Sequence, residues 1–280
     1  MIKTYLGCYP CFLRQALDAA RLAGASDEQQ KTILDRVLEM LTQIALSSTP
    51  PEIGDRVHRI VRQEVGHRDP YREAKETSTR QALALYPRLR KCVQEADDPL
   101  DVAVRLSIAG NIIDLGPHQQ YDLWDVIERV LTQPFAIDDR TAFREALGMA
   151  DRVLYLADNA GETVFDRLLI EVLQVPVVYT VKGGPVLNDA TREDALAAGL
   201  DQVAQVVETR SDAPGTILDR CSDEFWRLYN EVGVIVAKGQ ANYETLSHVG
   251  PKVFFLLQVK CPVIARDAGA GVGSFVLKQG

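Results

Sequence analysis

The chain has 280 residues, of which 46% are hydrophobic and 25% charged, so it can bury one large hydrophobic core or two smaller ones. Its formal net charge of −8 argues against a nucleic-acid-binding protein, and any phosphate site must be built locally from a cation, lysines or backbone amides. Its first residues lack an apolar core long enough for a signal peptide, so we expect none, and no apolar run of about 18 residues could span a membrane. Five cysteines are too few for a disulfide scaffold, so we expect a cytoplasmic protein without membrane partners.

The first half of the chain has the apolar periodicity of helices. Apolar residues recur at helical spacing within 12–23, and a capping box of Ser26 and Gln29 predicts the start of a second helix. The segment Thr49-Pro50-Pro51 is expected to end that helix, because proline disrupts a helix interior. Further helical patterns cover residues 55–65, 71–84 and 121–132. We therefore predict a helical N-terminal part over residues 1–150.

From residue 151 onwards, short apolar runs rich in valine and isoleucine alternate with helical patterns. Continuous apolar runs of this length are typical of strands that are buried on both faces of a parallel sheet. We therefore predict an α/β fold in which the helical part is followed by a Rossmann-like α/β portion over residues 151–280, with a mainly parallel sheet. The predicted strands are Val153–Ala157, Pro176–Val181, Val234–Ala237 and Val253–Val259, with a fifth candidate at Pro262–Ala265.

Polar residues follow three of these runs, at the point where each run ends. Asp158 and Asn159 come directly after the first run. The segment Lys182-Gly183-Gly184 follows the second run, with Asp189 a few residues later, and Lys238-Gly239 follows the third. In an open α/β sheet, ligands bind outside the carboxyl ends of the strands, so we expect these side chains to meet at one edge of the sheet.

These residue types suit a metal- and phosphate-binding site. Asp158, Asn159 and Asp189 carry the oxygen ligands that hard divalent cations such as Mg²⁺ or Mn²⁺ prefer. Lys182 and Lys238 offer positive charge to phosphate oxygens, and the neighbouring glycines allow close approach of the backbone. Each residue also has a purely structural explanation, since Asp and Asn cap helices, glycines form turns and lysines face solvent. Their common position at one sheet edge favours the functional interpretation.

Three segments of this half, read in order, resemble the damage-control phosphatase family, which was long known only as a domain of unknown function. They are LADNAGETVFDRLLIE (156–171), VKGGPVLNDAT (181–191) and KGQANYETL (238–246). Three upstream segments are also similar to that family, and the CxxC in the first of them resembles its smaller prokaryotic subgroup. These segments are CYPCFLRQA (8–16), HRDPYREAK (67–75) and AGNIIDLG (109–116).

The resemblance implies a metal-dependent phosphatase, a phosphoric monoester hydrolase that acts on sugar phosphates or on damaged phosphorylated cofactor intermediates. It implies one divalent cation (Mn, Co, Ni or Mg) that is held by Asp158, Asn159 and Asp189. It makes Lys238 the lysine that holds the substrate phosphate. Together, the resemblance and the polar clusters give Asp158, Asp189 and Lys238 as catalytic candidates, and Asn111, Asp114, Glu162, Lys182, Gly183, Gly239 and Asn242 as substrate-binding candidates.

Two other functions stay open on the residues alone. A nucleotide-dependent transferase could use a Rossmann-like sheet, although the first strand ends in DNAGE and not in GxGxxG. A non-catalytic protein could bind a metal or a phosphorylated metabolite through the same residues. For a phosphatase, the nucleophile is either water or Asp158 acting through an aspartyl-phosphate. A homo-oligomer is also possible.

Two motifs, a pair of cysteines and a glycine-rich segment, are not explained by this function. Cys8 and Cys11 form a CxxC, for which we favour a packing role over redox chemistry or half of a zinc site, since no second cysteine pair completes such a site. The glycine-rich segment at residues 269–273 resembles a nucleotide loop. No helical pattern follows it, so we predict a turn.

Overall fold

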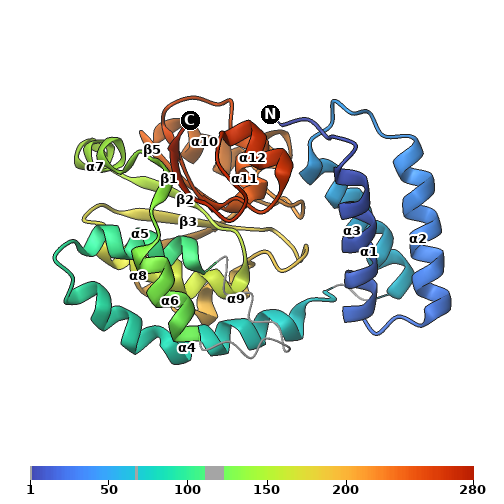
Figure 1. Cartoon of the computed structure of the whole chain (residues 1–280), viewed down its shortest axis with the longest axis horizontal. Coiled ribbons are helices and arrows are strands. Elements are labelled where there is room, and N and C mark those ends of the chain that lie inside the picture. The colour runs from blue at the N-terminus through green and yellow to red at the C-terminus, as the bar shows by residue number, and fades with distance from the viewer. Residues whose placement is uncertain (1, 67–68, 111–122) are drawn as a thin grey trace.

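The computed structural model describes residues 2–66, 69–110 and 123–280 (Figure 1). The predicted cleft residues Asn111 and Asp114 therefore lie outside the described residues. The helices are α1 (Cys8–Leu22), α2 (Asp27–Thr42), α3 (Pro50–Val65), α4 (Arg72–Gln94), α5 (Pro99–Ala109), α6 (Leu123–Thr132), α7 (Arg140–Met149), α8 (Thr163–Val172), α9 (Arg192–Ala197), α10 (Asp223–Glu231), α11 (Gly239–Leu246) and α12 (Pro262–Ala268). The strands are β1 (Phe135–Asp138), β2 (Val153–Leu156), β3 (Val177–Val181), β4 (Gln205–Glu208), β5 (Val234–Lys238), β6 (Val253–Gln258) and β7 (Phe275–Gln279).

Helices α1, α2 and α3 pack around an apolar core of their own, and they stand apart from the sheet in Figure 1. The predicted capping box is confirmed, since Ser26 Oγ accepts from the Gln29 amide and Gln29 Oε1 accepts from the Ser26 amide. The prediction for Thr49-Pro50-Pro51 is wrong, because α2 already ends at Thr42. Thr49 instead caps α3 and Pro50 opens it, where a missing amide hydrogen costs nothing.

A seven-stranded sheet in the order β1-β7-β6-β5-β2-β3-β4 forms the centre of the remaining chain. Strands β6, β5, β2, β3 and β4 are parallel, whereas β7 is antiparallel to β6 and parallel to β1. This confirms the mainly parallel α/β sheet. The strand predicted at Pro262–Ala265 is wrong, because these residues form the first turn of α12 with proline at its start.

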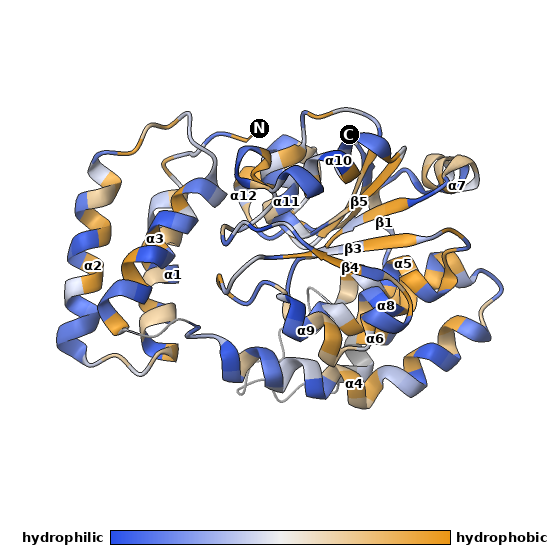
Figure 2. Cartoon of the chain, turned by 180° about the vertical axis from the view of Figure 1, so that it is seen from behind, coloured by the Kyte–Doolittle hydropathy of each residue, from blue (hydrophilic) through white to orange (hydrophobic). Residues whose placement is uncertain are grey.

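Both faces of the sheet are covered, and side chains alternate between them. Val153 and Tyr155 of β2 pack in one apolar layer with residues of α4, α5 and α8. Leu154 and Leu156 pack on the opposite face with residues of α10, α11 and α12. Strand β3 is buried along its whole length, and its ribbon is largely hydrophobic in Figure 2. This double burial explains why the central strands read as continuous apolar runs.

The sheet takes its first strand, β1, from before residue 151, and α4 and α5 contribute to the same apolar layer as the central strands. The domain boundary at 150/151 therefore stays a prediction. Within the described parts of the chain, no helix combines the length and apolar character needed to cross a membrane.

Candidate functional site

The loops that follow β2 and β3 are held together by backbone hydrogen bonds. The Ala190 amide donates to the Asp158 carbonyl at 2.8 Å, and the Ala160 amide donates to the Asn188 carbonyl at 2.8 Å. Asn159 and Asp189 form an isolated antiparallel bridge between the same loops. These bonds bring Asp158, Asn159 and Asp189 together at the carboxyl edge of the sheet. The site lies beside the boundary between β2 and β5, where the strand order reverses, and such a switch point is where ligands of these sheets bind.

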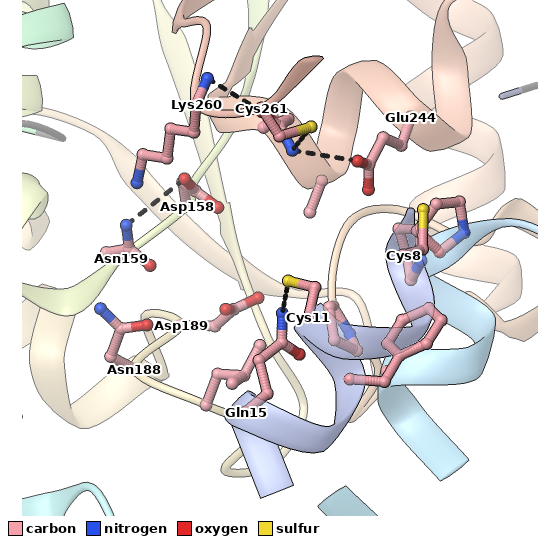
Figure 3. A pocket seen from close by; sticks show the side chains of 18 of the residues that line it. Cys8, Cys11, Gln15, Asp158, Asn159, Asn188, Asp189, Glu244, Lys260 and Cys261 are labelled. Carbon is pink, nitrogen blue, oxygen red and sulfur yellow. Dashed lines mark hydrogen bonds between the residues drawn. The ribbon is translucent and has the colours of Figure 1, made fainter. Parts of the chain in front are cut away.

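A cleft of about 470 Å³ opens at this edge, between the sheet and the helices α1 and α3 (Figure 3). Its volume lies within the range of pockets that hold small metabolites. One wall carries the polar groups of the sheet edge, and the facing wall includes cysteines, prolines and one phenylalanine of α1 and α3. The lining includes Cys8, Cys11, Phe12, Gln15, Pro50, Pro51, Asp158, Asn159, Glu162, Asn188, Asp189, Pro214, Gln240, Glu244, Lys260, Cys261 and Val263.

The Asp158 carboxylate packs directly over the Cα of Gly239. Gly239 has φ +75°, and a Cβ at this position would lie 1.8 Å from Asp158 Oδ2. Only glycine therefore leaves room for the carboxylate in this place. Since Gly239 follows β5 and Asp158 follows β2, this contact spans the switch point of the sheet.

The structural explanation by helix capping does not account for these polar residues. Asn159 precedes a short 3₁₀ segment, Ala160–Glu162, but its side chain makes no capping hydrogen bond. The helix after Asp189 is capped instead by Thr191 and Asp194, which form a reciprocal capping box. Helix capping therefore does not explain why the side chains of Asp158, Asn159 and Asp189 line the cleft.

The electrostatics of the edge favour a bound cation. Burial raises the pKa of Asp158 above its ordinary value, and the charge of Asp189 raises it further. Burial also raises the pKa of Asp189, although Lys182 opposes this shift from 3.4 Å. The buried Asp189 Oδ2 makes no hydrogen bond within the described residues, and its contact there is this ion pair with Lys182. Two crowded buried carboxylates are the environment that a divalent cation stabilises.

The Asn159 amide oxygen is the predicted third protein ligand of a cation at this position. Over the described ranges, no three His, Cys, Asp or Glu side chains converge as a metal site. Asn159 Nδ2 donates to Glu162 Oε1 at 2.6 Å and to Asp158 Oδ2 at 3.4 Å. Because carboxylates only accept hydrogen bonds, this contact fixes which end of the amide is the nitrogen. The predicted ligand set thus fits a hard cation in donor type.

Lys238 lies beneath the cleft and not on its surface. Its side chain is fully buried, and its Nζ is 2.6 Å from Asp166 Oδ1 and 3.0 Å from Glu162 Oε2. Burial alone would lower its pKa, but the two carboxylates raise it above the ordinary value. A direct bond to substrate phosphate would require Lys238 to leave both partners, so this placement does not support the predicted role.

The other predicted residues are divided between the cleft and the supporting structure. Glu162 lines the cleft next to Asn159. Lys182 is buried, and its Nζ donates to the Gly215 carbonyl. The Gly183 amide donates to the Ser211 carbonyl at 2.9 Å, on the side of a second cavity. Asn242 is buried and spends its amide on the carbonyls of Ala157 and Lys238, which ties α11 to the sheet.

Lys260 is a cleft residue that the sequence reasoning missed. It is exposed, it follows β6 at the same edge of the sheet, and in Figure 3 its side chain extends toward Asp158 and Asn159. Among the nearby cations, Lys260 lowers the pKa of Asp158 the most. The rule applied to the other strand ends would have found Lys260, because it directly follows the predicted strand Val253–Val259.

Three cysteines line the cleft as free thiols. Cys8 and Cys11 come from α1, and Cys261 lies at the start of α12. Burial raises the pKa of the Cys8 and Cys11 thiols. Gln15 donates to Cys11 Sγ at 3.4 Å, and Gln240 donates to Cys261 Sγ at 3.6 Å. The packing role of the CxxC stays a prediction.

Comparison with known proteins gives consistent similarities over the whole chain. A model of the damage-control phosphatase ARMT1-like domain matches residues 4–276. The chain is 35% identical to a damage-control phosphatase of Archaeoglobus fulgidus, over 97% of each chain. It is 34% identical to an uncharacterised protein of Methanocaldococcus jannaschii, over 99% of this chain and 95% of that protein. The crystal structure of a DUF89 family protein from Pyrococcus horikoshii matches it with a TM-score of 0.92 and 30% identity, covering 100% of this chain and 99% of the other.

Proposed function

Because the chain belongs to the damage-control phosphatase ARMT1-like domain family, we propose that it is a metal-dependent phosphatase of small phosphorylated metabolites. The observation that carries this proposal is the convergence of Asp158, Asn159 and Asp189 on one cleft that is also lined by Lys260. Sugar phosphates and damaged phosphorylated cofactor intermediates are the proposed substrates, and the name damage-control phosphatase of a relative supports the reaction class.

In this proposal, Asp158, Asn159 and Asp189 hold one divalent cation (Mn, Co, Ni or Mg). When bound, the cation supplies positive charge that polarises the phosphoryl group. The two carboxylates and the amide oxygen provide ligands of the required type on two loops that backbone hydrogen bonds hold together.

Lys260 is proposed to bind the substrate phosphate, in place of the buried Lys238. Its exposed ammonium lies in the cleft beside Asp158, whereas the ammonium of Lys238 is enclosed by two carboxylates. Positive charge aimed at the transferring phosphoryl group stabilises the charge that spreads over its oxygens in the transition state.

The proposed reaction is hydrolysis of a phosphate monoester. A water oxygen forms a new bond to phosphorus, the bond from phosphorus to the ester oxygen breaks, and the alcohol leaves with a proton. In this proposal the proton of the attacking water passes to Asp158 or Asp189, the two carboxylates at the reacting centre, and from there to the leaving alcohol. Trapping a phosphoryl-enzyme during turnover would instead assign the nucleophile to Asp158.

The test is phosphate release from a panel of sugar phosphates, phosphopantetheine compounds and nucleotides. Metal-stripped protein is supplied with Mg²⁺, Mn²⁺, Co²⁺ or Ni²⁺, and Asp158→Asn is compared with Asp201→Asn, which alters an exposed carboxylate in the segment before β4. Metal-dependent release that is lost only in Asp158→Asn supports the proposal. Folded, metal-loaded protein that releases no phosphate would leave a non-catalytic binding protein, and stabilisation by nucleotides alone would favour the transferase.

A further inference from the structure

Asp166 of α8 sits at the centre of a buried hydrogen-bond network beneath the cleft. Its side chain is fully buried, and its Oδ1 accepts from Tyr155 Oη at 2.7 Å and from Ser107 Oγ at 3.1 Å. Its Oδ2 accepts from Tyr179 Oη at 2.8 Å. A carboxylate held by three hydroxyl groups from α5, β2 and β3 is fixed in position.

This fixed carboxylate determines where Lys238 points. The ammonium lies 2.6 Å from Asp166 Oδ1, and its other carboxylate partner is Glu162 Oε2 at 3.0 Å. Both carboxylates are no more than 1% exposed, so water does not compete for these bonds. Lys238 therefore holds one oxygen of Glu162 and leaves the second oxygen for another donor.

The second oxygen of Glu162 faces the cation site. Glu162 Oε1 accepts from Asn159 Nδ2 at 2.6 Å, and this bond sets which end of the Asn159 amide turns to the carboxylate. Figure 3 shows the amide nitrogen of Asn159 directed at Asp158, with the amide oxygen on the other side of the group. Asn159 Oδ1 accepts no hydrogen bond from the described part of the chain, so it is available as a ligand oxygen.

We propose that Lys238 is a positioning residue that acts through Glu162 to present Asn159 Oδ1 to the cation. The inference rests on the proposed function, since it assigns a role within the same cation site. It replaces the direct phosphate contact predicted for Lys238. Groups that orient metal ligands in this way typically contribute a factor of 10 to 100 to metal affinity.

The test replaces Glu162 by glutamine, whose amide Lys238 should orient. The quantity measured is the affinity for Mn²⁺ in the absence of substrate. In Glu162→Gln, Lys238 can only donate, so it attracts the oxygen of the new amide and turns the nitrogen of that amide toward Asn159. Asn159 must then rotate and present its nitrogen to the cation. Mn²⁺ affinity, measured from the electron paramagnetic resonance signal of free Mn²⁺, is expected to fall about 10- to 100-fold.

A matched control separates orientation from the general effect of replacing a buried acidic side chain near the site. Glu244→Gln also replaces one buried carboxyl group that lines the cleft, but Glu244 bonds to Gln240 and not to Asn159. The affinity loss in Glu244→Gln is therefore expected to be much smaller. Equal losses in the two variants would show that the orientation of Asn159 does not matter, and would overturn the proposal.

Two double variants test whether Lys238 is the orienting group. Adding Lys238→Met to Glu162→Gln lets the new amide turn its nitrogen to Asp166 and its oxygen to Asn159, so affinity should recover to within about threefold of wild type. If circular dichroism shows that this variant does not fold, the double variant Asn159→Asp with Glu162→Gln tests the orientation of the new amide instead. There the new amide donates to the new carboxylate, which keeps one oxygen for the cation, so affinity should again recover.

The outcomes for this inference and for the proposed function are distinct. A folded double variant that binds Mn²⁺ as weakly as Glu162→Gln overturns the positioning role, as does wild-type protein that binds no Mn²⁺. Wild-type protein that binds Mn²⁺ and shows the predicted recovery, yet releases no phosphate from any ester, would support the positioning role and refute the phosphatase.

Discussion

Gly239→Ala tests the contact between Gly239 and Asp158 at the switch point. The added Cβ would lie 1.8 Å from Asp158 Oδ2 and 2.2 Å from its Cγ, whereas ordinary contact begins at 3.4 Å. The carboxylate must therefore move by about 1.6 Å, and a displacement of about 1 Å at a reacting group can cost about 100-fold in rate. We expect kcat/KM to fall by about 100-fold or more, together with a loss of Mn²⁺ affinity.

Gly269→Ala is the matched control for the backbone effect. Gly269 has the same φ of +75° as Gly239, but a Cβ there meets no atom within 4 Å. Alanine at such a φ costs roughly 1–2 kcal/mol in either place, so both variants should lose comparable stability in urea unfolding. Only Gly239→Ala should lose activity and Mn²⁺ affinity. Activity of Gly239→Ala within a few-fold of Gly269→Ala would refute the steric argument and the placement of Asp158 in the catalytic site.

Three further predictions concern phosphate binding, metal binding and pH. Lys260→Met should lower kcat/KM by about 10- to 100-fold, while the urea midpoint stays unchanged because the side chain is exposed; unchanged kinetics would remove Lys260 from the site. Mn²⁺ at 100 times its Kd should raise the free energy of unfolding by about 2.7 kcal/mol, and a gain that persists in Asp189→Asn would place the cation elsewhere. Burial lowers the pKa of His58 to about 3, below its unfolded value of 6.5, so its contribution to stability is complete above pH 6.5 and is lost as the pH falls. Wild type should therefore lose about 1.6 kcal/mol more than His58→Gln between pH 6.5 and pH 5 in urea titrations, and parallel losses would contradict a buried neutral imidazole.

The central strands could be predicted from sequence because they are buried on both faces. Strand β4 was missed because its edge position leaves Gln205 exposed, which breaks the apolar run. Strand β1 was missed for a similar reason, since its residues alternate between half-buried and exposed. The misassignment at Pro262–Ala265 has the opposite cause, because a four-residue apolar run does not distinguish a strand from the first turn of a helix.

The part of the candidate site that could be predicted from sequence consists of residues in the loops that follow the strands. Asp158 lies just after β2 and Asp189 lies in the loop after β3, so the parallel topology brings both to one edge of the sheet. The surroundings of Lys238 depend on Asp166, which lies 72 residues earlier on another element, and no local pattern links the two. A lysine after a strand therefore predicts a phosphate ligand, and the local sequence does not reveal the two carboxylates that surround Lys238.

The separate core of α1, α2 and α3 has a consequence for how such enzymes diversify. One wall of the cleft belongs to this bundle, whereas the groups proposed for the reaction belong to the sheet edge, and the two are stabilised by different apolar clusters. Substitutions at positions such as Phe12 can therefore reshape the space around the leaving alcohol without disturbing the packing beneath Asp158. Evolution or design can change the accepted ester in one unit while the hydrolytic chemistry is inherited intact in the other.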